Sequence, residues 1–301
     1  WHRSIESAHP LAMGHFYYFQ QIHFHSFAYS RLIGEIAIST PSRRNTLSPS
    51  RANDYINCPL LYRFRVIDKL PEPPSADALK GTLVHSVLEH LFGLVRLERT
   101  SDRAHDLLQP TWDELKVKTS GVEEMFQDVD LDQWLISAHS LLDRYFELED
   151  PKSFDPTELE KFVEYQMEDG PMIHGYIDRL DIAPTGEIRI VDYKTGKSPR
   201  AGYEEKSLFQ MRFYALILWR TLGEIPKRLQ LLYLGDKNRL ISEPTEAELV
   251  KTEGKILSIW SDIQLSYETG LWKPKKSKLC DWCAHQSICP EFGGTPPPLP
   301  E

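Results

Sequence analysis

The strongest constraint on this chain comes from residues 172–196, which predict two short strands joined by a tight turn. The segment reads M-I-H-G-Y-I-D-R-L-D-I-A-P-T-G-E-I-R-I-V-D-Y-K-T-G, and residues 184–186 supply the turn between two β-branched, alternating flanks. On the second flank, the residues that share one face of the strand are Ile188, Ile190, Asp192 and Lys194. An acid and a base therefore emerge together at the strand end.

Another acid, Asp178, lies near the end of the first flank. Pairing the two strands could bring its carboxylate close to that of Asp192. Two carboxylates so close repel each other unless a cation lies between them. The hairpin is therefore a candidate cation site, although an ordinary surface hairpin with solvated Asp and Lys side chains carries the same pattern and is the more common case for an isolated D-x-K.

Length and composition favour one main domain. A chain of 301 residues with 41% hydrophobic residues can bury one sizeable core. Residues 1–45 contain aromatics and histidines without a helical or strand period, and we interpret them as an N-terminal extension outside the core. Residues 291–301 form a Pro-rich tail that we expect to lack regular structure.

The formal net charge of -9 argues against a protein that grips nucleic acid through a bulk positive field. A metal site requires carboxylates, however, and a local basic patch can still follow a phosphate backbone. Candidates for such a patch, with a solvated surface as the equal alternative, are Arg63, Arg65, Lys273, Lys275, Lys276 and Lys278.

Four cysteines, with no signal peptide or apolar span of membrane length, lead us to expect free thiols in a reducing, cytoplasmic setting. Cys280, Cys283 and Cys289 have the spacing C-x-x-C-x-x-x-x-x-C, which places three thiolates on a short turn. Cys58, at the other end of the domain, is the candidate fourth ligand of one site. Thiolates suit zinc as well as iron.

Helical patterns surround the hairpin. Ser48 before Pro49 predicts a helix start, and residues 81–92 carry an apolar stripe of helical period with His85 at its edge. We expect an amphipathic helical insertion over residues 100–150 that covers the sheet. A lone histidine at the edge of a helix is usually only packed or solvated, so His85 alone indicates no function.

Further strands are expected over residues 158–167 and 228–234, on either side of the hairpin in sequence. In the helix that follows the hairpin, Gln210 and Tyr214 are four residues apart and share a face, as plain amphipathicity also produces. Thr245 with Glu248 is a capping box that opens a helix to about residue 266.

Taken in order, these motifs resemble the PD-(D/E)XK nucleases, and specifically the RecB-like exonuclease branch with a C-terminal iron–sulfur cysteine cluster. The matching patterns are Y-x-x-C-P-x-x-Y at residues 55–62, G-x-x-x-H at 81–85, G-x-x-D at 175–178, D-x-K at 192–194, Q-x-x-x-Y at 210–214 and the cysteine trio. The resemblance implies an α/β fold over residues 46–290. Its restriction-endonuclease-like core is a central mixed β-sheet flanked by helices, and an iron–sulfur staple joins the N- and C-terminal parts.

The resemblance also implies the roles of particular residues. Mg²⁺ or Mn²⁺ would be held by His85, Asp178, Asp192 and the backbone carbonyl of Tyr193. The implied catalytic set is Asp178, Asp192, Lys194, Gln210 and Tyr214, in which Lys194 orients the attacking water and Gln210 and Tyr214 position the substrate backbone. The implied ligands of a [4Fe–4S] cluster are Cys58, Cys280, Cys283 and Cys289. Asp181 lies off the motif, and we interpret it either as structural or as a residue that supports the metal ligands.

The function that follows from the resemblance is a metal-dependent DNA exonuclease that prefers single strands and acts in DNA repair or recombination, with a helicase or repair protein as partner and no membrane. Two alternatives remain open at this stage. One is a catalytically silent iron–sulfur module that binds DNA beside a helicase. The other is a zinc-stabilised protein that is not a nuclease.

Overall fold

The hairpin predicted from residues 172–196 is present in the structure, a computed structural model that describes residues 45–300. Strand β3 (Met172–Ile182) pairs antiparallel with β4 (Ile188–Lys194). At the turn the amide of Ala183 donates to the carbonyl of Glu187 at 2.9 Å, and Gly186 has a φ of 97°, which a residue without a Cβ adopts readily.

The hairpin lies inside a six-stranded mixed sheet of order β1-β3-β4-β5-β6, in which β2 (Glu158–Gln166) also pairs with β3. Strand β5 (Arg228–Tyr233) runs parallel to β4, whereas β6 (Asn238–Ser242) and β2 are antiparallel to their neighbours. The short β1 (Thr46–Leu47) is parallel to β3. The expectations for residues 158–167 and 228–234 are thus confirmed, while β1 and β6 were not predicted.

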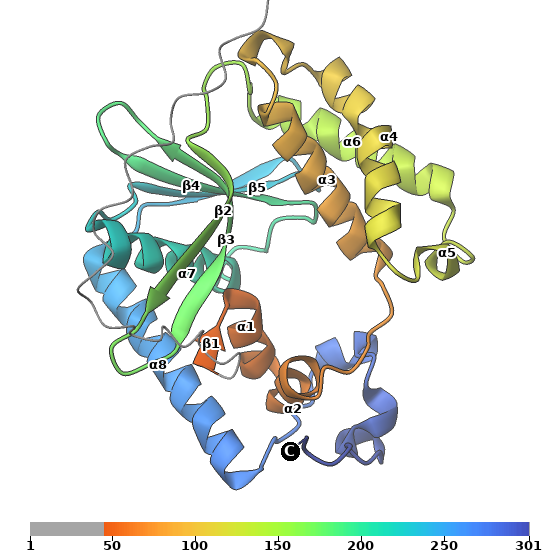
Figure 1. Cartoon of the computed structure of the whole chain (residues 1–301), viewed down its shortest axis with the longest axis vertical. Coiled ribbons are helices and arrows are strands. Elements are labelled where there is room, and N and C mark those ends of the chain that lie inside the picture. Colours follow the sequence, from red (N-terminus) through yellow and green to blue (C-terminus); the bar gives the residue numbers. More distant parts are fainter. Residues whose placement is uncertain (1–44, 301) are drawn as a thin grey trace, which may run out of the picture. The chain divides into compact units, whose positions relative to one another are not determined.

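Helices cover both faces of the sheet (Figure 1). One face packs against α7 (Glu205–Leu222), α8 (Glu246–Thr269), α1 (Pro49–Asn57) and α2 (Pro59–Tyr62). The other face packs against α3 (Ala76–Phe92), α4 (Ser101–Lys118), α5 (Val122–Met125) and α6 (Leu131–Leu148). A π-helix at Arg63–Ile67 follows α2, and 3₁₀ turns lie at Arg96–Glu98, Lys278–Trp282, Gln286–Ile288 and Pro290–Phe292.

The alternation of β4 links the two cores. Ile188 and Ile190 lie in the core beneath α7, whereas Val191 and Tyr193 lie in the core beneath α3 and α6. Because side chains alternate along a strand, Asp192 points to the same face as Ile188 and Ile190, toward α7.

The helix boundaries follow local sequence signals. The Ser48 side chain accepts from the amide of Arg51 at the start of α1, and Thr245 with Glu248 forms both bonds of the capping box that opens α8. Both starts were predicted from the sequence. These bonds satisfy amide groups that the first helical turn leaves without an intrahelical partner.

The expected insertion corresponds to α4, α5 and α6, which the chain forms between residues 101 and 148. The expected extension, residues 1–45, lies outside the described residues apart from Asn45. The Pro-rich tail has no helix or strand beyond residue 292, yet Arg63 donates to the carbonyl of Pro297, so the described part of the tail contacts the domain. None of the described helices is long and apolar enough to cross a membrane.

Candidate active site

At the end of β4, Asp192 and Lys194 contact Gln210 of α7. Lys194 Nζ lies 2.7 Å from Asp192 Oδ2 and donates to Gln210 Oε1 at 3.1 Å. The Gln210 amide nitrogen in turn donates to Asp192 Oδ1 at 2.9 Å and to the Tyr214 hydroxyl at 3.2 Å. The structure therefore brings together four of the residues expected in the catalytic set, on the α7 face of the sheet.

His85 reaches the same strand end from α3. Its Nε2 lies 2.9 Å from the carbonyl of Tyr193, and its Nδ1 lies 3.4 Å from Asp178 Oδ2. Because a carbonyl only accepts, Nε2 carries the proton and Nδ1 presents a lone pair toward Asp178. Asp178 Oδ2 also accepts from the amide of Tyr193 at 2.8 Å. The Tyr193 carbonyl thus orients His85. The role of this carbonyl as a metal ligand stays a prediction.

Glu160 of β2, which the sequence analysis did not single out, lies beside His85 and Asp178. His85, Glu160 and Asp178 each offer one ligand atom, and these atoms all lie within 4.8 Å of one another. Among the described residues they are the one group of three or more His, Cys, Asp or Glu side chains at that spacing. Asp192 is not part of this group, and its carboxylate contacts Lys194 and Gln210. Its role as a metal ligand also stays a prediction.

An irregularity in β2 and β3 brings Glu160 to this position. The ladder pairs Leu159 with Arg179 and Lys161 with Ile177, so Glu160 lies opposite Asp178. Leu159 packs against the core beneath α3, whereas Ile177 belongs to the core beneath α7. The strands therefore exchange faces at these two acids, and Glu160 has a φ of 44°, which is uncommon for a residue with a Cβ.

Burial and neighbouring charges shift the pKa values of the three groups. Burial, with the neighbouring carboxylate of Asp192, raises the pKa of Asp178 well above its usual value. Burial, with the charges of Glu89 and Asp192, raises the pKa of Glu160 to about 7. Burial lowers the pKa of His85, which keeps the imidazole neutral and able to coordinate. Crowded acids that hold protons are poised to exchange them for a metal ion.

Lys194 remains charged in this environment. Burial works against its ammonium group, but the carboxylates of Asp192 and Asp178 outweigh that effect and raise the pKa of Lys194. Asp181, interpreted from the sequence as structural or as a support for the metal ligands, lies apart from this group and pairs with Arg179 at 3.2 Å and with Arg189 at 2.8 Å. Arg179 is fully buried, so these ion pairs satisfy a charge inside the domain.

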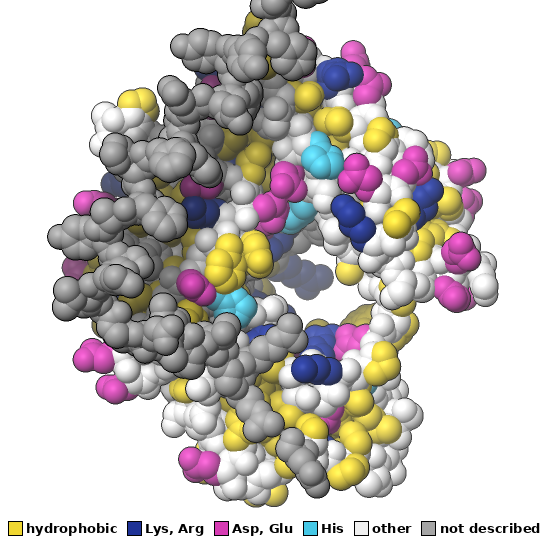
Figure 2. All heavy atoms as spheres, viewed as in Figure 1, with side chains coloured by type: hydrophobic (Ala, Val, Ile, Leu, Met, Phe, Trp, Pro, Cys, Tyr) yellow, Lys and Arg dark blue, Asp and Glu magenta, His cyan; other side chains and the backbone are white. Residues whose placement is uncertain are grey.

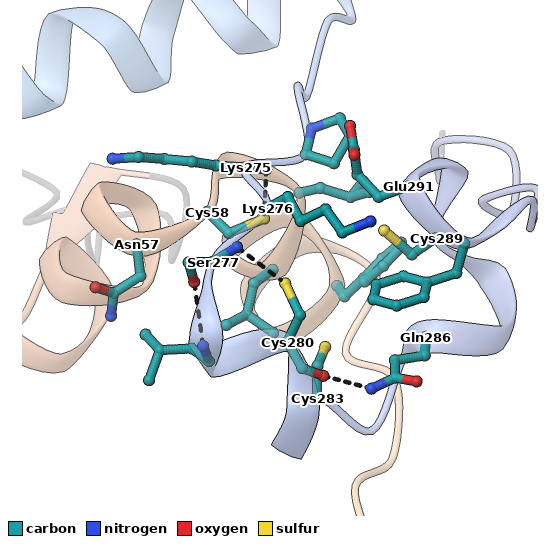
Figure 3. A pocket seen from close by; sticks show the side chains of 16 residues that line it. Asn57, Cys58, Lys275, Lys276, Ser277, Cys280, Cys283, Gln286, Cys289 and Glu291 are labelled. Carbon is teal, nitrogen blue, oxygen red and sulfur yellow. Dashed lines mark hydrogen bonds between the residues drawn. The ribbon is translucent and has the colours of Figure 1, made fainter.

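The four cysteines also converge, although more than two hundred residues separate Cys58 from the others. All four thiols are free and line one pocket between the α1–α2 junction and the C-terminal turns (Figure 3). The amides of Lys275 and Ser277 approach Cys58 Sγ and Cys280 Sγ, each at 3.4 Å. Burial, with the nearby thiols of the other three cysteines, raises the pKa of Cys289.

Residues 46–290, which carry this site and all four cysteines, match the family described as the PD-(D/E)XK nuclease superfamily. The chain belongs to this superfamily. PD-(D/E)XK nucleases use divalent metals, and the group formed by His85, Glu160 and Asp178 is chemically suited to hold one. The superfamily resemblance inferred from the sequence motifs is therefore confirmed.

Two phage proteins are similar to this PD-(D/E)XK chain over most of their length. The Gene 69 protein of Mycobacterium phage D29 is 27% identical over 264 residues, which cover 78% of this chain and 93% of the phage protein. The Gene 69 protein of Mycobacterium phage L5 is 24% identical over 290 residues, which cover 81% of this chain and 96% of the phage protein. A crystal structure from Eubacterium rectale, provisionally named an exonuclease, aligns with a TM-score of 0.55 at 16% identity over 85% of this chain and 93% of that chain, which shows a shared fold.

Proposed function

We propose that this chain is a metal-dependent DNA exonuclease of the RecB-like branch that prefers single-stranded DNA. The observation that supports it most is the arrangement around one strand end, where Asp178 faces His85 and Glu160 on one side and Lys194 contacts Asp192 and Gln210 on the other. A surface hairpin would leave these groups in solvent, but here the side chains of Asp192 and Asp178 are only 4% and 12% exposed.

The donor set fits Mg²⁺ or Mn²⁺, because carboxylate oxygens suit Mg²⁺ and one imidazole is equally compatible with Mn²⁺. His85, Glu160 and Asp178 would hold the ion, and Asp192, whose charge acts on both Asp178 and Glu160, would complete the set. When bound, the ion polarises a phosphate and lowers the pKa of a water molecule.

The protein's own groups supply positioning and charge. The Lys194 ammonium, held by Asp192 and Gln210, would orient the attacking water and stabilise negative charge that develops on the phosphate. Gln210 and the Tyr214 hydroxyl would hold the substrate backbone, since they form a connected pair at the end of β4. The expected product carries a 5′-phosphate.

The preference for single strands is supported by the surface near the site. Figure 2 shows an opening beside β2 and β3, bounded by α3 and by the segment that connects the π-helix to it, with Lys and Arg side chains on its walls. Lys and Arg side chains at the edge of a narrow opening can follow a flexible phosphate backbone.

For the four cysteines we propose a [4Fe–4S] cluster rather than zinc. A zinc site is typically built from two paired cysteine knuckles, whereas this chain has one C-x-x-C pair, a third nearby cysteine and the remote Cys58. All four line one pocket, and a cluster binds four such thiolates through several iron atoms.

The cluster's role would be to staple the domain. It would join Cys58, between α1 and α2, to the C-terminal turns, where Lys275 Nζ also donates to the carbonyl of Ile56 at 3.0 Å. Holding two distant parts of the chain together removes entropy from the unfolded state. We further propose a cytoplasmic role in repair or recombination, with a helicase supplying unwound DNA.

The proposal is tested by comparing wild-type protein, Lys194→Ala and Lys197→Ala on end-labelled single- and double-stranded DNA, each with Mn²⁺ or EDTA. Lys197 is exposed and lies three residues beyond the site, which makes it a matched control. We expect Lys194→Ala to lose about 100-fold or more of the cleavage rate, and the control to keep it. Equal degradation by all three proteins would reject the site. A wild-type protein that binds DNA but cleaves none would instead support the silent module.

A further inference from the structure

An exposed group of aromatic rings lies on β2 and β3. Phe162 and Tyr176 are directly opposite each other in the ladder, with ring centroids 5.1 Å apart, and His174 lies 6.0 Å from Phe162. Phe162 is 44% exposed and Tyr176 is 57% exposed. We call Phe162, His174 and Tyr176 the aromatic platform. Large rings grouped in solvent often mark a contact surface, whereas single exposed rings are ordinary.

The platform is continuous with the proposed metal site. Phe162 follows Glu160 by two residues on β2, and Tyr176 precedes Asp178 by two residues on β3. At about 3.3 Å per residue, the rings lie about 7 Å along the strands from the acids. Val163 and Ile177 point into the core beneath α7, so Phe162 and Tyr176 point away from it. In Figure 2, hydrophobic and His side chains gather over these strands at the edge of the opening.

We propose that the aromatic platform stacks one or two unpaired bases of a single-stranded substrate next to the phosphate that is cut. Base faces stack on aromatic rings whatever the sequence, which suits an exonuclease that must accept every nucleotide. The bases of a duplex are already stacked on each other, so the platform would engage single strands selectively. This inference rests on the proposed function and adds to it a specific source of strand preference.

A basic group lies near the far end of the platform. Strand β1 pairs Thr46 with Met172, two residues before His174 on β3. Arg51 donates to the side chain of Thr46 at 2.8 Å and is only partly buried. A guanidinium beside stacked bases can contact their phosphates. The proposed metal site, the aromatic platform and the Arg51 guanidinium therefore lie in this order along β3.

The test is a binding measurement in EDTA, which needs no cleavage. The affinities of wild-type protein and of the Phe162→Ala/Tyr176→Ala double variant are measured for a labelled single strand and for the same strand with abasic sugars at its terminal positions. We expect the double variant to bind the ordinary strand about 5- to 150-fold more weakly than wild type for each base that stacks. Abasic sugars should weaken binding to wild type by a similar factor and leave binding to the double variant unchanged.

Ile182→Ala is the matched control, because Ile182 is an exposed apolar residue (41%) on the same strand beyond the site. It should keep the wild-type affinities, and all variants should keep the wild-type melting temperature within a few degrees because the changed side chains are exposed. Equal binding of ordinary and abasic strands by wild type would overturn the proposal and assign the rings to another occupant, such as a protein partner. A wild type that stacks bases but shows no cleavage with Mn²⁺ would support the platform and reject the nuclease function.

Discussion

The ring of Tyr214 occupies the space that a side chain at position 175 would need. A Cβ added to Gly175 would lie 2.5 Å from Tyr214 Cε1, closer than such atoms approach in proteins. Gly175 opens the G-x-x-D motif of β3, and Tyr214 closes the Q-x-x-x-Y motif of α7. Two motifs nearly forty residues apart are thus coupled by contact, because the helix can approach the sheet only where β3 lacks a side chain.

Gly175→Ala should therefore damage the site through Tyr214. We expect overpacking to cost about 1–3 kcal/mol of unfolding free energy, and displacement of Tyr214 and Gln210 to lower cleavage by up to about 100-fold. Chemical denaturation and the cleavage assay measure the two effects. Gly254→Ala is the control, since this exposed glycine of α8 has no atom within 4 Å of an added Cβ and should be neutral or slightly stabilising. Full activity of Gly175→Ala would show that the contact does not position the site.

The affinity for Mn²⁺ should rise with pH up to about 7. The folded pKa of Glu160, about 7, is above its ordinary value of 4.5. In metal-free protein the folded state therefore binds this proton more tightly, and unfolding free energy falls as pH rises between these values. A metal ion must displace the proton, so its apparent affinity increases over the same range.

Calorimetric titration with Mn²⁺ at pH 6, 7 and 8 measures this linkage. Glu160→Gln should weaken binding and, at pH 6, release about one proton fewer for each ion bound, a difference that falls to about half a proton at pH 7 and close to none at pH 8. Glu164→Gln, an exposed acid on the same strand, should keep both the affinity and the proton release of wild type. A Glu160→Gln protein with the wild-type pH dependence would exclude Glu160 as a ligand.

Cys280→Ala should remove the cluster and weaken the fold. Anaerobically purified wild type is expected to be brown and to contain about four iron atoms per chain. The variant should be colourless and should melt at least about 5 °C lower, because the staple between Cys58 and the C-terminal turns is lost. Trp282→Ala, in the same turn and 80% exposed, is the control and should keep iron and stability. Stoichiometric zinc with no iron in wild type would contradict the assignment.

Local sequence signals were sufficient for the hairpin and for the pairing of Asp192 with Lys194. The turn residues and the period-two alternation of β4 act over a few positions, so they can be interpreted without tertiary information. A role for His85 could be assigned only through resemblance, since its partner Tyr193 lies more than one hundred residues away. Cys58 was a candidate because it is the one cysteine outside the C-terminal trio, but its place beside them depends on the fold. Strands β1 and β6 escaped prediction because one has two residues and the other is polar and lies at the sheet edge.

Glu160 escaped prediction for a different reason. Strand β2 carries Glu158, Glu160 and Glu164 at alternate positions, and nothing in their spacing distinguishes one from another. Only the register that places Glu160 opposite Asp178, and the exchange of faces at that point, directs its carboxylate to His85. Register and local distortion depend on packing of the whole sheet, so a single sequence does not specify them.

The most direct measurement is the anomalous scattering of crystals grown with Mn²⁺. A metal peak within coordination distance of Asp178 and of at least one of His85 and Glu160 is the predicted result. Crystals saturated with Mn²⁺ that show no peak there, with these three side chains turned away from each other, would contradict the proposed catalytic centre.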